Sequence, residues 1–272
     1  MGSGQPHYHL GNTDAEHDRL IRQARRLAPI TERFFREAGV AQGQRVLDLG
    51  AGVGDVAMLA AEIVGPSGSV VAIERDARTM ARARARAAEA HVANIEFVQD
   101  DIDGYSPDAP FDALVGRYIL QFLPDAAATL RRLVPALRPR GIVAFQEGSW
   151  APFLALSRGL PLWFAAVSLL HDAAVRAGVD LEMGPALYRV LQEAGLPGPR
   201  MRLEMELACD PEFIRWTSDS VRSVLPQIER LRIAHDAIGD LETLEERLQI
   251  EVARSKAVVP WIGLVGAWTR RD

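Results

Sequence analysis

The chain of 272 residues is long enough for one large α/β domain that carries additional segments. Hydrophobic residues make up 48% of the chain and the formal net charge is −5, so no overall positive field attracts nucleic acid. The one cysteine, Cys209, has no partner for an internal disulfide or a CxxC motif, which excludes a cysteine-based zinc site and predicts no bound metal.

Helical and extended patterns alternate along the first half of the chain. Thr13 and Glu16 have the spacing of a capping box, and they predict a helix that Pro29 kinks or breaks and Gly39 ends. Between Arg45 and Glu147 the pattern predicts strands at 45–50, 69–74, 95–99, 111–116 and 141–147, separated by helices at 55–65, 77–91 and 125–139. Such apolar strands are typical of a parallel sheet with helices on both faces.

The second half of the chain is less regular. Residues 150–179 and 211–255 have mostly helical patterns, 184–194 predicts a helix, and 200–208 and 261–271 predict strands. We therefore expect a single domain, 1–272. Its predicted parts are a helical leader (1–39), a core that binds a cofactor (40–148), two helical lid insertions (149–183 and 210–257) and two returns to the core sheet (184–209 and 258–272).

The stretch VLDLGAGVGD (46–55) places a glycine-rich turn between the first strand and the following helix. In this position the helix N–H groups and the positive end of the helix dipole face a ligand. A tight turn of a doubly wound protein without a ligand remains an alternative. A dinucleotide site would have G-x-G-x-x-G, whereas this chain has Asp48-x-Gly50-x-Gly52-x-Gly54.

Acidic residues follow the next two strands at their carboxyl ends, the usual ligand-binding edge of an open α/β sheet. Glu74 ends the second strand, where a carboxylate can accept hydrogen bonds from a ribose diol. Asp101 follows the third strand, where it could accept from an exocyclic amine. The fourth strand ends at Gly116 with a loop that is able to cover a ligand.

These stretches resemble the motifs of class I S-adenosylmethionine-dependent methyltransferases. VLDLGAGVGD is similar to the first motif, VVAIERD to the second, FVQDDI to the adenine-contacting motif and FDALVGRYILQFLPD to the motif after the fourth strand. RPRGIVAFQE is similar to the fifth strand and its turn, with Arg140 in place of the more usual glycine. The leader YHLGNTDAEHDRLIRQ resembles leaders of a bacterial subgroup that acts on small molecules of the natural-product type.

The resemblance implies a Rossmann-like, doubly wound, mostly parallel seven-stranded sheet that binds S-adenosyl-L-methionine. It implies that Asp48 orders the glycine loop and helps to hold the methionine amine, directly or through water, and that Gly50 and Gly52 give the methionine moiety room. The resemblance also implies that Glu74 contacts the ribose, that Asp101 and Ile102 contact the adenine, and that Arg75 lies at the adenine edge. It implies that Arg117, after Gly116, contacts the methionine carboxylate or the substrate, and that Tyr8 closes over the cofactor.

Methyl transfer by in-line displacement depends mainly on alignment, and it needs a base only where the nucleophile must lose a proton. The candidate bases are His171, either a core histidine or a base at the seam between lid and cofactor, and Glu147, either a substrate contact or a solvated strand end. Relatives that use a base often have histidine where this chain has Gln121.

The segments that the family folds over its substrate carry no basic cluster and many aromatic residues: Trp150, Phe153, Trp163, Phe164, Phe213 and Trp216. Some of these aromatic residues must belong to the core. A lipophilic or aromatic small molecule, such as a secondary metabolite, fits these segments better than a phosphorylated one. A methyltransferase-like enzyme that catalyses a cyclisation or rearrangement, and a cofactor-binding module without activity, are the alternatives.

No apolar run reaches the length of a transmembrane helix, and the polar start of the chain does not resemble a signal peptide. We therefore expect a cytoplasmic protein with a small-molecule substrate that binds neither nucleic acid nor membrane. A homo-oligomer through the N-terminal leader is a further possibility, because a detached helix is easily exchanged between subunits.

Overall fold

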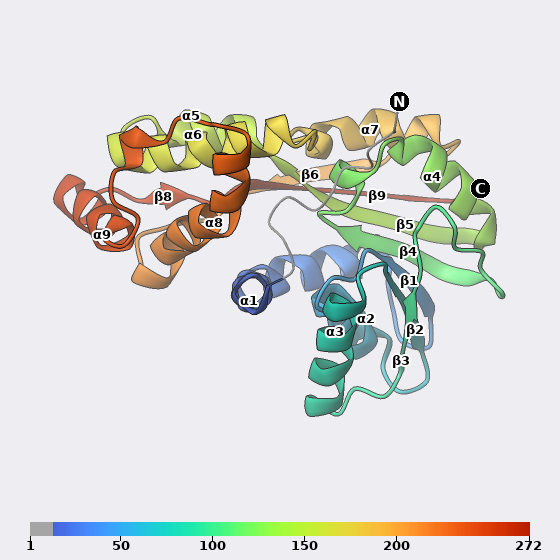
Figure 1. Cartoon of the computed structure of the whole chain (residues 1–272). Helices are drawn as coiled ribbons and strands as arrows, with labels where there is room; N and C mark the ends of the chain where they lie inside the picture. The colour runs from blue at the N-terminus through green and yellow to red at the C-terminus, as the bar shows by residue number, and fades with distance from the viewer. Residues whose placement is uncertain (1–12) are drawn as a thin grey trace.

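The computed structural model describes residues 13–272 of the chain; the predicted contact of Tyr8 lies outside them. Seven strands form one sheet in the order β3-β2-β1-β4-β5-β9-β6 (Figure 1). Their bounds are β1 Arg45–Leu49, β2 Ser69–Glu74, β3 Ile95–Gln99, β4 Phe111–Arg117, β5 Leu137–Ser149, β6 Arg200–Glu204 and β9 Gly263–Arg270. Neighbouring strands are parallel except that β9 runs antiparallel to β5 and β6. The predicted α/β fold with a mostly parallel seven-stranded sheet is confirmed.

Helices cover both faces of this sheet (Figure 1). On one face, α1 (Asp14–Ala38), α2 (Asp55–Val64) and α3 (Ala77–Glu89) bury their apolar sides against β1, β2 and β4. On the other face, α4 (Ala126–Leu133) and α7 (Met183–Glu193) do the same, close to the short 3₁₀ helices η1 (Leu120–Phe122) and η2 (Val134–Ala136). The strand order reverses between β1 and β4, so the ends of these two strands border the crevice in which open α/β sheets bind ligands.

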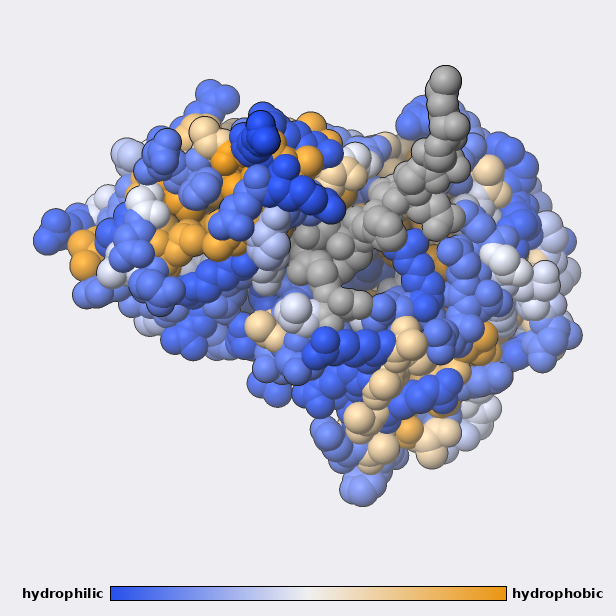
Figure 2. Space-filling view, viewed as in Figure 1, coloured by the Kyte–Doolittle hydropathy of each residue, from blue (hydrophilic) through white to orange (hydrophobic). Residues whose placement is uncertain are grey.

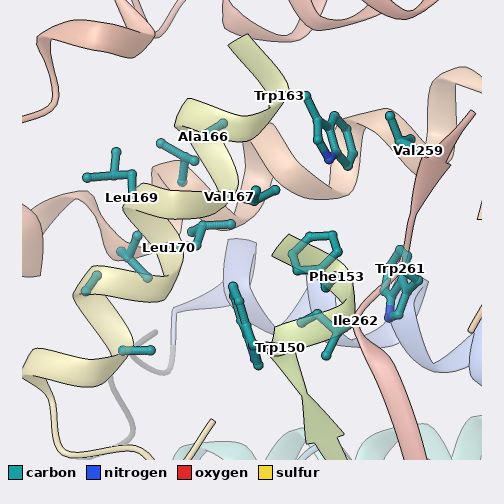
Figure 3. Packing of buried hydrophobic residues seen from close by; sticks show 14 of the residues in the cluster. Trp150, Phe153, Trp163, Ala166, Val167, Leu169, Leu170, Val259, Trp261 and Ile262 are labelled. Carbon is teal, nitrogen blue, oxygen red and sulfur yellow. The ribbon is translucent and has the colours of Figure 1, made fainter. Parts of the chain in front are cut away.

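The lid is a separate helical layer beyond the end of β5 (left in Figure 1). It consists of α5 (Trp150–Ser157), α6 (Pro161–Arg176), α8 (Pro211–Arg230), η3 (Asp236–Ile238), α9 (Leu244–Ser255) and the two-stranded sheet of β7 (Leu207–Ala208) and β8 (Val259–Pro260). Phe153 and Trp163 (Figure 3) are almost fully buried in its own hydrophobic core, and so is Phe213. Apolar surface also gathers on this layer (Figure 2), where Leu156 and Val258 are exposed. Between residues 13 and 272, no helix is both long and apolar enough to traverse a bilayer.

The leader helix α1 begins and ends as the sequence predicts. The Thr13 side chain accepts a hydrogen bond from the Glu16 N–H, and Gly39 caps the other end with a φ of 100°. Pro29, however, does not break the helix, which continues to Ala38. Leu27, before the proline, and Phe34, after it, are both buried, so packing on both sides outweighs the one backbone hydrogen bond that proline cannot donate.

Two of the predicted strands differ most from the structure. Strand β5 begins at Leu137, four residues before the predicted start at 141, so the last residues of the predicted helix 125–139 are extended. A register shift between Phe111 and Ala113 of β4 accommodates the added pair of Phe111 with Leu137. The predicted strand 200–208 is two strands, β6 and β7, that pair with different partners, β9 and β8. The chain leaves the core sheet between them and joins the lid.

Arg140 occupies a backbone conformation that favours glycine. Its φ is 64°, and its N–H donates to the Arg271 carbonyl, so the turn is held in this geometry. A left-handed conformation costs an L residue about 1–2 kcal/mol, while glycine loses about 0.4–1 kcal/mol more entropy on folding. We therefore expect Arg140→Gly to raise the free energy of unfolding by about 0.5–1 kcal/mol in urea titrations. Arg140→Ala is the control; it keeps the strain, and an equal gain there would contradict this explanation.

Candidate active site

A cavity of about 630 Å³ lies where the carboxyl ends of the strands, α1 and the lid meet. The glycine loop and the residues after β2 and β3 form one half of it, which we call the core half. Residues of α5, α6, α8 and the segment between β8 and β9 form the opposite wall, the lid half. This volume is within the range of small-molecule sites.

The two predicted glycines of the loop have different surroundings. Both have positive φ, 63° at Gly50 and 54° at Gly52. A Cβ atom at Gly50 would lie 2.3 Å from Cδ1 of Ile119, so the absent side chain makes room for the loop after β4. At Gly52 a Cβ atom would meet nothing within 4 Å, although the residue lines the cavity. Gly52 therefore leaves space for a ligand, whereas the space beside Gly50 is taken by Ile119.

Glu74 lies at the cavity wall and holds two backbone segments. Its Oε2 accepts a hydrogen bond from the Gly52 N–H (3.0 Å), and its Oε1 accepts from the Asp76 N–H (2.9 Å). Burial raises the pKa of this carboxyl, and the two N–H groups oppose the rise. Each carboxylate oxygen has a second acceptor position, so the same group can also receive the hydroxyls of a ribose.

The predicted adenine residues come together on the same wall. Arg75, Asp101 and Ile102 all line the cavity, and Asp100, which the sequence analysis did not select, lines it beside them. The Asp100 Oδ1 accepts from the Asp101 N–H, and the Asp101 Oδ1 accepts from the Asp103 N–H. These turns fix both carboxylates at the end of β3.

Arg117 is the predicted residue that connects the sheet, α1 and the cavity. It lines the cavity, and its Nη1 donates to the Thr31 Oγ1, which donates to the Gln146 Oε1 (2.8 Å each). Burial lowers the pKa of Arg117, and Asp55 and Asp48 oppose this effect. Both Asp48 and Gly116 lie behind the wall and do not line the cavity.

Asp48 is fully buried at the end of β1, and neither carboxylate oxygen has a hydrogen-bond partner among residues 13–272. Burial raises its pKa well above the usual range, and the Arg117 guanidinium partly offsets this. The side chain therefore lies behind the glycine loop and not at the cavity surface, and a cation bound at the loop would favour its ionised form.

The arginine-rich helix α3 clamps the glycine loop through Arg86. Arg86 donates to the Val53 carbonyl of the glycine loop (2.6 Å) and pairs with Asp55 at 2.7 Å. Both side chains are largely buried, and burial raises the pKa of Asp55 while Arg86 opposes the rise. The alternation of arginine with alanine gave no sign of this clamp, because its partners lie in another element.

The leader helix contributes residues that the sequence analysis missed. His17, Arg19 and Gln23 of α1 line the cavity. The His17 Nε2 lies 3.2 Å from the Thr79 Oγ1, and burial lowers the pKa of this histidine. The Arg19 Nη1 donates to the Gln23 Oε1. The available signal for these residues was that they are polar side chains on the buried side of an otherwise amphipathic helix.

Glu147 is not a solvated strand end. Its side chain is fully buried, and its Oε1 accepts from the N–H groups of Ile119 and Leu120 (2.9 and 2.7 Å). The Oε2 is buried without a partner, and burial raises the pKa of the carboxyl to about 8. The residue does not line the cavity. It holds the turn after β4 in place, so any effect on a ligand passes through that turn.

His171 lies on α6 but not among the described residues that line the cavity. Its ring is partly exposed, its Nδ1 is 3.2 Å from the Asp172 Oδ1, and its centroid is 6.0 Å from that of Trp150. It is therefore not a core histidine bonded to a carbonyl. Gln121 and Trp150, in contrast, do line the cavity.

The lid aromatics divide into two groups. Trp150 and Trp216 line the cavity, whereas Phe153, Trp163 and Phe213 belong to the lid core. Figure 3 shows Trp150 and Ile262, which both line the cavity, near Phe153 and Trp261 at the base of the lid. The Trp216 indole N–H donates to the Gln23 Oε1 and so joins the lid to α1.

The core half suits S-adenosylmethionine. It offers a carboxylate at the end of β2 for a ribose, carboxylates at the end of β3 for an adenine, an opening beside Gly52, and buried acids behind the loop that favour a cation.

Comparisons with known proteins agree with this geometry. Residues 41–195 match the model of a family described as a methyltransferase domain. The chain is 35% identical over 202 residues to the Ubiquinone/menaquinone biosynthesis C-methyltransferase UbiE of Pseudomonas entomophila (strain L48), covering 73% of this chain and 77% of that protein. It is 30% identical over 168 residues to the Trans-aconitate 2-methyltransferase of Azoarcus sp. (strain BH72), covering 55% of this chain and 63% of that protein.

Among solved structures, the YcgJ protein of Bacillus subtilis superposes with a TM-score of 0.58 at 14% identity, covering 91% of this chain and 99% of that one, which shows the shared fold. The family match covers more than half of the chain and includes the glycine loop and the ends of β2 to β5. The chain therefore belongs to the class I S-adenosylmethionine-dependent methyltransferases, with S-adenosylmethionine as its cofactor.

Proposed function

We propose that the protein transfers a methyl group to a lipophilic or aromatic small molecule, and that this acceptor is a secondary metabolite. The observation that carries the proposal is the division of one cavity. Its core half has charged residues at the strand ends, and its lid half has aromatic and aliphatic side chains. A cofactor and an apolar substrate can therefore meet within the same cavity.

The protein's contribution is alignment. S-adenosylmethionine supplies a methyl group that is already activated by its positively charged sulfur. The glycine loop and Glu74 orient the cofactor. The substrate is confined by Trp150, Trp216 and the turn after β4. Positioning of this kind can contribute about 7–11 kcal/mol to a reaction. Among the described residues lining the cavity, His17 is a candidate base, because burial lowers its pKa and so favours the neutral ring, the form that can accept a proton.

The names of two relatives indicate two different classes of substrate. One acts in ubiquinone and menaquinone biosynthesis and the other on trans-aconitate. The apolar lid half favours a substrate of the first kind, since an anion of several carboxylates would lose its hydration there without a matching set of cations.

The test is transfer of label from methyl-labelled S-adenosylmethionine to a panel of lipophilic phenols and quinols, carboxylic acids and phosphorylated metabolites. We expect labelled product from the lipophilic members. Labelled product from the phosphorylated members alone would refute the proposed substrate class. Conversion of a substrate without a gain of methyl mass or release of S-adenosylhomocysteine would instead identify a cyclase or isomerase.

A further inference from the structure

The side-chain amide of Gln23 on α1 has one end bound and one end free. Its Oε1 accepts from the Arg19 Nη1 (2.8 Å) and from the Trp216 indole N–H (2.9 Å). Its Nε2 makes no hydrogen bond with any residue of the described chain, 13–272, and, unlike the buried groups without a partner, it has accessible surface. The residue is partly exposed and lines the cavity. The amide thus presents unpaired N–H groups at an accessible wall.

The chemistry of the two neighbours fixes which end of the amide is free. Guanidinium and indole N–H groups donate hydrogen bonds and cannot accept them. Turning the amide over would place its NH₂ group against both donors, and both hydrogen bonds of Gln23 would be lost. The free end is therefore the donor end, and a ligand that binds there must offer an acceptor.

Both neighbours of Gln23 are themselves held in place. The Arg19 Nε and Nη2 donate to the two carboxylate oxygens of Glu16 (2.7 and 2.6 Å), and this pair is almost fully buried. The ring centroid of Trp216 lies 4.4 Å from that of Trp261, which packs against a further aromatic ring of the lid core. The amide is therefore oriented before a ligand binds, and this lowers the entropic cost of binding.

Gln23 stands at the border between the lid half and a second cavity. That cavity has a volume of about 370 Å³ and lies between α1 and α8. Arg19, Gln23 and Trp216 belong to the walls of both cavities. Because Trp216 is part of the lid half and bonds directly to Gln23, a molecule that packs on this indole in the lid half has the amide at its edge.

The other arginines of the second cavity are paired or solvated. Arg22 pairs with Asp219 (2.6 Å), and Arg26 pairs with Asp210 (2.6 Å). Arg25 is exposed, so solvent screens its charge. A carboxylate beside the amide would lose hydration without gaining an unpaired, buried cation, whereas a neutral oxygen needs only a donor.

We propose that the border of the lid half at Gln23 is a subsite for a neutral oxygen acceptor of the substrate, a carbonyl or an ether, and that the Gln23 Nε2 donates to this oxygen. The inference rests on the proposed function and narrows its substrate class to apolar molecules that carry such an oxygen. Gln23 is thus a specificity residue for the substrate.

Three probes of similar shape test the subsite: 2-acetylnaphthalene with a neutral acceptor, 2-ethylnaphthalene without one, and 2-naphthoate with a charge. Binding of each is measured by calorimetry on the full chain saturated with S-adenosylhomocysteine. We expect the carboxylate to bind the wild type most weakly. Gln23→Glu keeps an oxygen for Arg19 and Trp216 but replaces the donor by an acceptor. It should weaken the ketone by about 2- to 10-fold and leave the hydrocarbon unchanged.

Two further variants separate the donor from the added charge. Gln23→Met removes the donor without adding a charge, so it should also weaken the ketone more than the hydrocarbon. Gln192→Glu adds the same charge at an exposed glutamine of α7 that lines neither cavity, and it should leave the binding of every probe unchanged.

Equal weakening of ketone and hydrocarbon by both Gln23 variants would overturn the subsite, because it would reduce Gln23 to a part of the wall; the proposed apolar substrate would stand. Tightest binding of the carboxylate to the wild type would overturn the neutral acceptor. If S-adenosylhomocysteine binds and none of the probes does, the subsite and the proposed substrate class fail together.

Discussion

Replacing Glu74 with alanine should weaken binding of S-adenosylhomocysteine by about 10- to 150-fold, the equivalent of a charge-assisted hydrogen bond of about 1.5–3 kcal/mol. The carboxylate lies at the cavity wall and accepts from the N–H groups of Gly52 and Asp76. Its removal therefore deprives the ribose of an acceptor and also loosens the glycine loop. Calorimetry on the purified variant measures the dissociation constant.

Two further variants separate these effects. Glu74→Gln keeps an acceptor for one of the backbone N–H groups but loses the charge, so it should fall between the wild type and the alanine variant. Glu96→Ala removes an exposed carboxylate on β3 that does not line the cavity, and it should leave affinity unchanged. Unaltered affinity in a folded Glu74→Ala protein would disprove the ribose contact.

Stability should fall as the pH rises through neutrality because of Glu147, and Glu147→Gln should abolish that part of the loss. The pKa of this buried carboxyl is raised from 4.5 to about 8. Between these values the folded state binds more protons than the unfolded state, so the free energy of unfolding decreases with pH in this window. The decrease amounts to at most about 5 kcal/mol across the whole window.

Glutamine keeps an oxygen that can accept from the Ile119 and Leu120 N–H groups but places an amide where the Oε2 has no partner. The variant should therefore be less stable than the wild type near pH 5, by about 1–3 kcal/mol, and should gain on it toward pH 9. Urea titrations between pH 5 and 9 measure this difference. Other buried carboxyls, such as Asp48, are present in both proteins and cancel.

Glu251→Gln is the matched control for this pH series. Glu251 also accepts from two backbone N–H groups, those of Leu162 and Trp163, but it lies in the lid and is only partly buried. A change of pH slope in this variant equal to that of Glu147→Gln would contradict the assignment of the effect to the burial of Glu147. Parallel curves for wild type and Glu147→Gln would show that Glu147 ionises as it does in the unfolded chain.

The cofactor half of the site was predictable because each of its elements is local. Glu74, Asp101 and Ile102 directly follow apolar strands, and parallel strands bring their carboxyl ends to one edge of the sheet. The cavity accordingly contains the predicted residues Gly50, Gly52, Glu74, Arg75, Asp101, Ile102 and Arg117. A short window of sequence carried each of these signals, and the alternation of strands and helices carried the topology.

The roles of other residues could not be predicted from the sequence, because these residues contact neighbours that lie far along the chain. Gly50 has no side chain because Ile119 occupies that space, and Glu147 is buried because the turn after β4 folds over it. His171 shares an apolar helix stripe, yet in the packing of α6 against α5 and α8 it is not among the described residues that line the cavity. Periodicity identifies a buried face without identifying what covers it.

The sequence by itself thus determined the sheet, the glycine loop and the acidic strand ends, since local hydrophobic patterns and turn residues specify them. Only the tertiary structure decided which residues outside the cofactor half line the cavity. Tyr118, Trp150 and Ser220 come from three distant segments, and nothing in their local sequence distinguishes them from core residues. Their common position follows from the packing of α5, α6 and α8 around one cavity, because side-chain volumes that meet across the fold, and not the order of residues, set its shape.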